Sequence, residues 1–126
     1  MNVIVRSLNR TFGARMAKSG RFVLLETTGR KSGRKSATPV GYEHAGEGAL
    51  YVGAGSATAH WAHNLLADPR CRASLNGETR DYHAEALDGD ARETALRAVK
   101  GRYGPGMADR IGAGPVFRLQ PVRAAD

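Results

Sequence analysis

The stretch FVLLETTGRKSGRKSATPV, residues 22–40, contains the pattern that decides the fold. Residues 22–27 are rich in aromatic and branched side chains and are bounded by glycines, which predicts a strand. A glycine-rich turn follows over 29–35, and the chain then returns in a second predicted strand over 36–44. Pro39 lies inside this second strand. Because proline cannot donate a hydrogen bond to a neighbouring strand, we expect it at an edge or a bulge.

The rest of the chain extends this hairpin pattern. Ala45–Gly48 and Asn76-Gly77 are hairpin turn signals. The other predicted strands cover 49–54, 71–75, 78–87 and 116–119, and the predicted helices cover 2–18, 60–67 and about 88–100. About six antiparallel strands, an N-terminal helix and two further helices indicate an α+β fold, a small barrel with helices packed on it. A length of 126 residues indicates one domain over 1–126. The motif Gly-x-Gly-x-x-Gly is missing, so a parallel nucleotide-binding sheet has no support.

The positive charge is concentrated in the first quarter of the chain. The formal net charge is +7, and residues 1–35 hold nine basic side chains against one acidic side chain, Glu26. This asymmetry predicts an anionic partner, such as nucleic acid, a phosphorylated ligand or an anionic membrane surface. Nucleic acid fits poorly, because aromatic residues are 6% of the chain and do not interleave with the basic ones.

The predicted helix over 2–18 has apolar residues at every fourth position, with basic residues largely off that stripe. We expect it to cover the end of the sheet. The alternative is a basic amphipathic helix in peripheral contact with an anionic membrane. The N-terminus lacks the apolar core of a signal peptide, so we expect a cytoplasmic protein, with membrane association through this helix as the alternative.

The cysteine and histidine residues predict neither a disulfide nor a metal site. The one cysteine, Cys71, excludes an internal disulfide and a zinc site built on several thiolates. We expect Cys71 to be a small buried strand residue, since no base is paired with it. The four histidines show no ligand spacing that indicates a metal.

Two segments contain residues suited to chemistry. The turn from Gly29 to Lys35 combines two glycines, which permit close backbone approach, with arginine, lysine and serine donors for an anion. A solvated basic hairpin is the alternative. In the predicted helix over 60–67, Trp61 and Asn64 are three residues apart and share one face. This pair could support a planar ligand, and a core tryptophan is the alternative.

Three motifs follow one another in the chain. They are LLETTGRKSG over 24–33, then Thr38-Pro39, and then Trp61-x-x-Asn64-Leu-x-Ala-Asp-Pro69. Together they resemble the deazaflavin-dependent nitroreductase family, and the resemblance runs from about residue 3 to residue 120. Members of this family are split β-barrel, FMN-binding-like oxidoreductases that use coenzyme F420.

The resemblance implies a split barrel with F420 bound along a basic groove. It also implies hydride transfer from the reduced coenzyme to an electron-poor acceptor such as a quinone, a nitro compound or an enone. The alternatives are an FMN-dependent split-barrel reductase or oxidase, and a cofactor-binding protein without catalysis. Barrels of this type are often dimers, so a homodimer is expected.

The resemblance also assigns roles to single residues. The turn falls where the family cradles the phosphate, the next strand passes the coenzyme, the loop at 55–57 meets the ring, and the helix at 60–67 closes the pocket. The implied cofactor-binding residues are Arg30, Lys31, Ser32, Gly33, Lys35, Thr38, Pro39, Gly55, Ser56, Ala57, Trp61 and Asn64. Tyr103 is the candidate acid that protonates the reduced acceptor, and simple packing on the barrel is its alternative.

The chain departs from the family pattern at two places. Ser36 stands where the family commonly has an arginine, two residues before Thr38. Residues 53–56 read Gly-Ala-Gly-Ser where the family often has Ser-Lys-Gly-Gly, and the loop looks about two residues shorter. A cationic contact is lost there, so we expect weaker binding of F420 or a different preferred cofactor.

Overall fold

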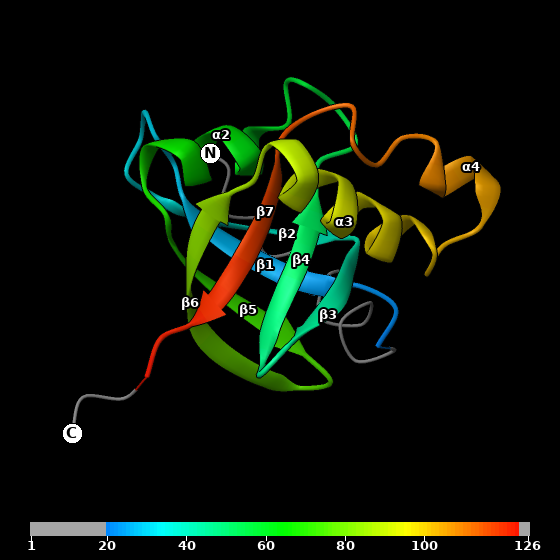
Figure 1. Ribbon diagram of the computed structural model, residues 1–126. Helices are drawn as coiled ribbons and strands as arrows, with labels where there is room; N and C mark the ends of the chain where they lie inside the picture. Colours follow the sequence, from blue (N-terminus) through cyan, green and yellow to red (C-terminus); the bar gives the residue numbers. More distant parts are fainter. Residues whose placement is uncertain (1–19, 124–126) are drawn as a thin grey trace.

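The computed structural model describes residues 20–123, and within them seven strands form one curled antiparallel sheet (Figure 1). The order across the sheet is β2-β1-β5-β6-β7-β4-β3. The strands are β1 (Val23–Thr28), β2 (Lys35–Val40), β3 (Tyr42–Gly46), β4 (Ala49–Gly53), β5 (Arg70–Leu75), β6 (Glu78–Ala86) and β7 (Val116–Pro121). The helices are α2 (His60–Ala67), α3 (Gly89–Lys100) and the single-turn α4 (Pro105–Ala108).

The strand count is seven rather than the predicted six, because the segment 36–44 forms parts of two strands. β2 pairs with β1, whereas β3 pairs with β4, so the two strands lie at opposite edges of the sheet. Gly41 stands between them. A Cβ at Gly41 would lie 3.3 Å from Cε2 of Tyr103, so a side chain at this corner would press on that ring. The edge position of β2 confirms the prediction for Pro39.

The local signals for turns and helices are largely confirmed. Asn76 and Gly77 both have positive φ, 54° and 83°, as the predicted hairpin turn requires. Helix α2 ends at Ala67, immediately before the Asp-Pro pair. The helix predicted over 2–18 lies outside the described residues, and the single-turn α4 is a helix that the sequence did not predict.

The core has two parts that lie on either side of β4. The larger cluster fills the curl of the sheet and receives Ala62 and Leu65 from α2. The smaller cluster joins Val99 of α3 to the segment after it and to Tyr51 on the other face of β4. Both faces of β4 are therefore covered, which explains its continuous run of apolar residues. None of the described helices is long and apolar enough to cross a membrane.

The segments singled out from the sequence gather at one end of the curled sheet. Figure 1 shows the 29–34 turn, helix α2, the loop after β4 and the loop before β7 at this end. The hairpin turns at residues 47–48 and 76–77 lie at the opposite end.

Candidate functional site

Arg30 joins the turn between β1 and β2 to helix α2. Its backbone N–H donates to Asn64 Oδ1 at 3.1 Å, and its Nη1 donates to the same oxygen at 2.9 Å. Nη1 also donates to the carbonyl oxygen of His60 at 3.4 Å, and Nη2 lies 3.4 Å from His60 Nδ1. A cavity of about 240 Å³ is formed between turn and helix; it is lined by Gly29, Arg30, Lys31, Ser32, His60 and Asn64. The basic turn and the tryptophan helix predicted from the sequence therefore form the walls of one site.

Asn64 is the buried strut of this site. Its side chain accepts both Arg30 hydrogen bonds, and its Nδ2 donates to Thr27 Oγ1 at 3.1 Å. Asn64 is 4% exposed and Thr27 is 1% exposed, so these bonds are shielded from water. The amide of Asn64 thus fixes the position of the turn. A direct contact between Asn64 and a coenzyme stays a prediction.

The turn itself is closed by its own backbone. Gly29 N–H donates to the carbonyl oxygen of Arg34 at 2.7 Å, and Gly33 N–H donates to that of Gly29 at 2.8 Å. Gly33 has φ of +73°, a conformation that favours glycine. The side chains of Lys31 and Arg34 are exposed, and neither makes a hydrogen bond or ion pair with any residue in 20–123. The turn therefore presents two positive charges that have no partner among the described residues, on a fixed backbone.

The register of β2 separates three residues that the resemblance groups together. Thr38 pairs with the core residue Leu25, so its side chain lies on the face of the sheet on which α2 packs. Lys35 and Pro39 alternate with it and lie on the other face. Lys35 Nζ donates to Thr28 Oγ1 at 2.7 Å on that face. Of these three residues, Thr38 is the one on the α2 side of β2.

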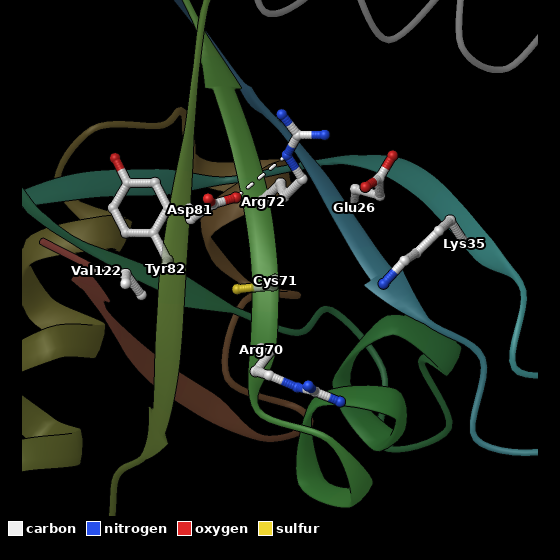
Figure 2. A pocket seen from close by; sticks show the side chains of 8 residues that line it. All are labelled: Glu26, Lys35, Arg70, Cys71, Arg72, Asp81, Tyr82 and Val122. Carbon is white, nitrogen blue, oxygen red and sulfur yellow. Dashed lines mark ion pairs between the residues drawn. The ribbon is translucent and has the colours of Figure 1, made fainter. Parts of the chain in front are cut away.

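Lys35 lines a different cavity, of about 370 Å³, beside β1, β5 and β6 (Figure 2). Arg72 Nε and Asp81 Oδ1 form an ion pair at 3.3 Å in its wall. Cys71 also belongs to this wall, is 6% exposed, and burial raises the pKa of its thiol to about 12. This confirms Cys71 as a buried strand residue. The charges around this cavity are mixed and partly paired, unlike those of the 29–32 turn.

The loop after β4 is clamped by the segment that precedes β7. The backbone N–H groups of Gly112 and Gly114 both donate to the carbonyl oxygen of Ala54, at 3.0 and 3.3 Å. Nη2 of Arg92 on α3 donates to the carbonyl oxygens of the same two glycines, at 2.9 and 3.1 Å. A Cβ at Gly114 would overlap the carbonyl oxygen of Ser56. The loop at 54–57 therefore has a fixed backbone position.

Trp61 and the 55–57 loop flank α2 at this end of the sheet. The Trp61 ring is half-buried and lies 5.9 Å, centroid to centroid, from the core residue Phe117. Gly55, Ser56 and Ala57 are exposed, and the carbonyl oxygen of Ala57 lies 2.7 Å from His63 Nε2. Contact of Trp61 or of the loop with a coenzyme ring stays a prediction.

The Tyr103 hydroxyl is engaged by the backbone. It accepts a hydrogen bond from the Tyr42 N–H at 2.9 Å and donates to the carbonyl oxygen of Arg21 at 2.7 Å. The ring stacks on Phe22 at 5.6 Å, and burial raises the pKa of the phenol. Tyr103 is not among the residues that line the cavity between the turn and α2. Its described contacts are those of a packing residue, and a catalytic role stays a prediction.

Comparison with known proteins decides the family. The family model for F420H(2)-dependent quinone reductases matches residues 1–112. The chain belongs to this family. It is an oxidoreductase that uses coenzyme F420, as the resemblance in its three motifs implied.

Solved structures agree with the family and with the fold. A structure described as an F420-H2 dependent reductase (FDR-A) is 27% identical, with 79% of this chain and 94% of that chain covered and a TM-score of 0.65. HutZ, a heme storage protein from Vibrio cholerae, is 19% identical, with 92% of each chain covered and a TM-score of 0.66. A structure described as a domain-swapped dimer is 24% identical, with 90% and 98% covered and a TM-score of 0.67. The last two show the fold alone.

The donor set of this quinone reductase family member fits the coenzyme. F420 carries a phosphate and an oligoglutamate tail, which require cations and N–H or O–H donors. The cavity between turn and α2 offers arginine, lysine, serine and a glycine-rich backbone, and no carboxylate is among its described lining residues. When bound, F420 supplies the hydride chemistry, so this chain's own residues bind, orient and shield.

Two residues that position the site, Thr27 and Arg92, were not predicted from the sequence. Thr27 stands inside the first motif, two residues after Leu25 and four after Val23, so it shares the buried face of β1, which was a signal for an inward side chain. Arg92 had no such signal, because its partners, the carbonyl oxygens of residues 112 and 114, are distant in the sequence.

Proposed function

We propose that the Gly29–Ser32 turn and the start of α2 bind the phosphate and glutamate end of F420, and that the reduced coenzyme delivers its hydride to a quinone. The observation that carries the proposal is the docking of Arg30 on Asn64 and His60. This docking creates a cavity with cationic walls at the place that the family resemblance implies.

The distribution of ion pairs supports the same assignment. The described ion pairs join Arg70 to Asp68, Arg72 to Asp81, Arg80 to Glu78 and Arg102 to Glu43. None of these ion pairs includes a residue of the turn. Lys31 and Arg34, both positively charged, are close to each other in the sequence. Unpaired like charges on one short turn repel each other, and an anionic ligand removes that repulsion.

The amide groups of α2 add to the attraction. Its N-cap residue is Ala59, which offers no side-chain hydrogen bond, and its first turn contains no acidic residue. The positive end of the helix dipole is therefore not neutralised by the chain itself. His60, at this end, lines the cavity.

The ring end of the coenzyme is assigned to loop 55–57, Trp61 and the α2-facing side of β2, where Thr38 lies. The clamp on Ala54 supports this assignment because it holds the loop backbone in place before any ligand arrives. The nitro compounds and enones implied by the resemblance are alternative acceptors for the same hydride.

The test is a titration of the protein with oxidised F420, followed by fluorescence, at low and at high salt. For Lys31→Gln we expect the affinity to fall about three- to tenfold at low salt and the salt dependence to shrink. The matched control is Lys100→Gln, because Lys100 is an exposed lysine at the end of α3. Unchanged affinity and unchanged salt dependence in Lys31→Gln would show that the anionic end binds elsewhere.

Three finer expectations belong to the proposal. The protein is cytoplasmic, it forms a homodimer, and, as the alternative to a helix that covers the end of the sheet, residues 2–18 contact an anionic membrane peripherally, which would bring the site to an acceptor dissolved in the membrane. The basic, amphipathic composition of this segment supports the contact. Light scattering after size exclusion tests the dimer. Co-sedimentation with anionic and with neutral vesicles tests the membrane contact, and equal binding to both would contradict it.

A further inference from the structure

Arg110 lies against the loop that follows β4. Its Cβ is 3.7 Å, and its carbonyl oxygen 3.9 Å, from the position that a Cβ would occupy on Gly55. Both residues are exposed. Because glycine has no side chain, the Cβ of Arg110 lies close to the loop backbone. Figure 1 shows the segment before β7, to which Arg110 belongs, at the same end of the sheet as α2 and the 29–34 turn.

The backbone around Arg110 is fixed. The carbonyl oxygen of Arg110 accepts a hydrogen bond from the Ala113 N–H at 3.2 Å. Gly112, two residues later, is bonded through its N–H to Ala54 and through its carbonyl oxygen to Arg92. The guanidinium of Arg110 is therefore carried by a segment whose position is set by α3 and by the loop itself.

The charge of Arg110 has no partner within residues 20–123. Its guanidinium makes no hydrogen bond or ion pair with any residue that the structure describes, in contrast to Arg92 and Arg102. The loop beside it carries no charge of its own, since every side chain from Gly53 to Ala59 is uncharged. Arg110 thus places a positive charge beside the loop over 53–59, which has no charged side chain.

Contacts between described residues connect Arg110 to the basic turn. Arg30 contacts His60 at the start of α2, His63 contacts Ala57 in the loop, and the Cβ of Arg110 lies 3.7 Å from the position that a Cβ would occupy on Gly55 in the same loop. The 29–34 turn and the segment before β7, which both carry cations, therefore lie at the same end of the sheet as α2 and the loop that precedes it. An anionic ligand bound along this end of the sheet would meet both.

We infer that Arg110 is a second cationic contact of the coenzyme site and binds an anionic or carbonyl oxygen of F420 beside loop 55–57. The inference rests on the proposed function of the basic turn. The oxygen belongs either to the phosphate and glutamate end or to the deazaflavin ring, and one experiment distinguishes the two sources.

The experiment titrates the full chain with oxidised F420 and, separately, with the deazaflavin core that lacks phosphate and glutamates. Arg110→Gln should bind F420 about three- to tenfold more weakly at low salt, with less loss at high salt. Arg123→Gln is the matched control, because Arg123 is an exposed arginine two residues after the end of β7. Arg110→Lys, which keeps the charge, should retain affinity within about threefold.

The outcomes separate this inference from the proposed function. Weaker binding of F420 alone assigns the oxygen to the phosphate and glutamate end, and equal weakening for both probes assigns it to the ring. If Arg110→Gln binds both probes like the unaltered protein while Lys31→Gln loses F420, the inference is overturned and the proposed function stands. If neither variant loses affinity, the proposed site is wrong and the inference fails with it. Loss in Arg123→Gln equal to that in Arg110→Gln would reduce the effect to net charge and overturn the inference as well.

Discussion

Replacement of Asn64 tests whether a buried amide holds the basic turn in place. Asn64→Leu keeps the branched shape of the side chain but removes the acceptor for two Arg30 donors and the donor to Thr27. Each hydrogen bond contributes about 1 kcal/mol, and the shielded partners lose their bonds without gaining water. We expect the free energy of unfolding to fall by about 3 kcal/mol. For a chain of 126 residues this corresponds to a fall in Tm of about 10 °C.

Asn64→Asp separates the structural role of the hydrogen bonds at residue 64 from the effect of charge in the cavity on ligand binding. A carboxylate keeps an oxygen for both Arg30 donors, and the Thr27 hydroxyl can turn to donate instead of accept. We expect stability to change by less than about 1 kcal/mol. The new negative charge lines the cavity, however, and repels an anionic ligand by about 1–2 kcal/mol, which lowers F420 affinity about five- to thirtyfold.

The assays are thermal unfolding followed by circular dichroism and F420 titration followed by fluorescence. Thr27→Val supplies the control, because it removes one partner of Asn64 and should cost about 1 kcal/mol; combined with Asn64→Leu, its effect should be less than additive. A Tm of Asn64→Leu within about 2 °C of the unaltered protein would refute the claim that the hydrogen bonds of Asn64 hold the turn in place. Unchanged affinity of Asn64→Asp would refute the placement of Asn64 beside the anion.

Three other predictions follow from buried groups. Tyr103→Phe removes a hydroxyl with two backbone partners, so unfolding free energy should fall by about 2 kcal/mol while the pH profile of kcat keeps its shape; a changed profile with unchanged stability would instead indicate an acid. Gly114→Ala should displace loop 54–57 and lower both Tm and F420 affinity, because the added methyl group overlaps the carbonyl oxygen of Ser56; normal melting would contradict the clamp. Cys71 should resist iodoacetamide at pH 8 in the folded protein and react after unfolding in urea, since its pKa is raised to about 12. A folded pKa above the ordinary value near 9 also means that the stability contributed by the neutral thiol is lost as the pH rises from 9 toward 12.

The fold was predictable where the signal is local. Alternating buried residues in β1, the Asn76-Gly77 turn and the Asp-Pro stop after α2 depend on neighbours a few residues apart. Strand pairing is not local, which is why the break at Gly41 was missed: its two strands pair with different partners, which the residues of 36–44 do not specify by themselves. The membership of the chain in an F420 family was predictable because the three motifs lie in a fixed order.

The site was predictable as a set of segments and less so as a set of side-chain directions. The turn at 29–32 and α2 do meet, as the resemblance implied. The residues of β2 divide between two faces because side chains alternate along a strand, so Lys35 and Thr38 cannot serve one cavity wall. The placement of Arg110 beside Gly55 depends on the course of the segment before β7, which no local pattern specifies.

The described residues of the site fall into two kinds with different energetic roles. Asn64, Thr27 and Arg92 use their polar atoms on the protein itself, so they stabilise the fold and set the positions of the turn and the loop. Lys31 and Arg110 have no described partner, so their charges add repulsion to the folded state instead of stability. Because the hydride belongs to the coenzyme, binding geometry is the main contribution of the chain. Replacement of Asn64, Thr27 or Arg92 should therefore reduce stability and affinity together. Replacement of Lys31 or Arg110 should reduce affinity and leave stability unchanged or slightly higher.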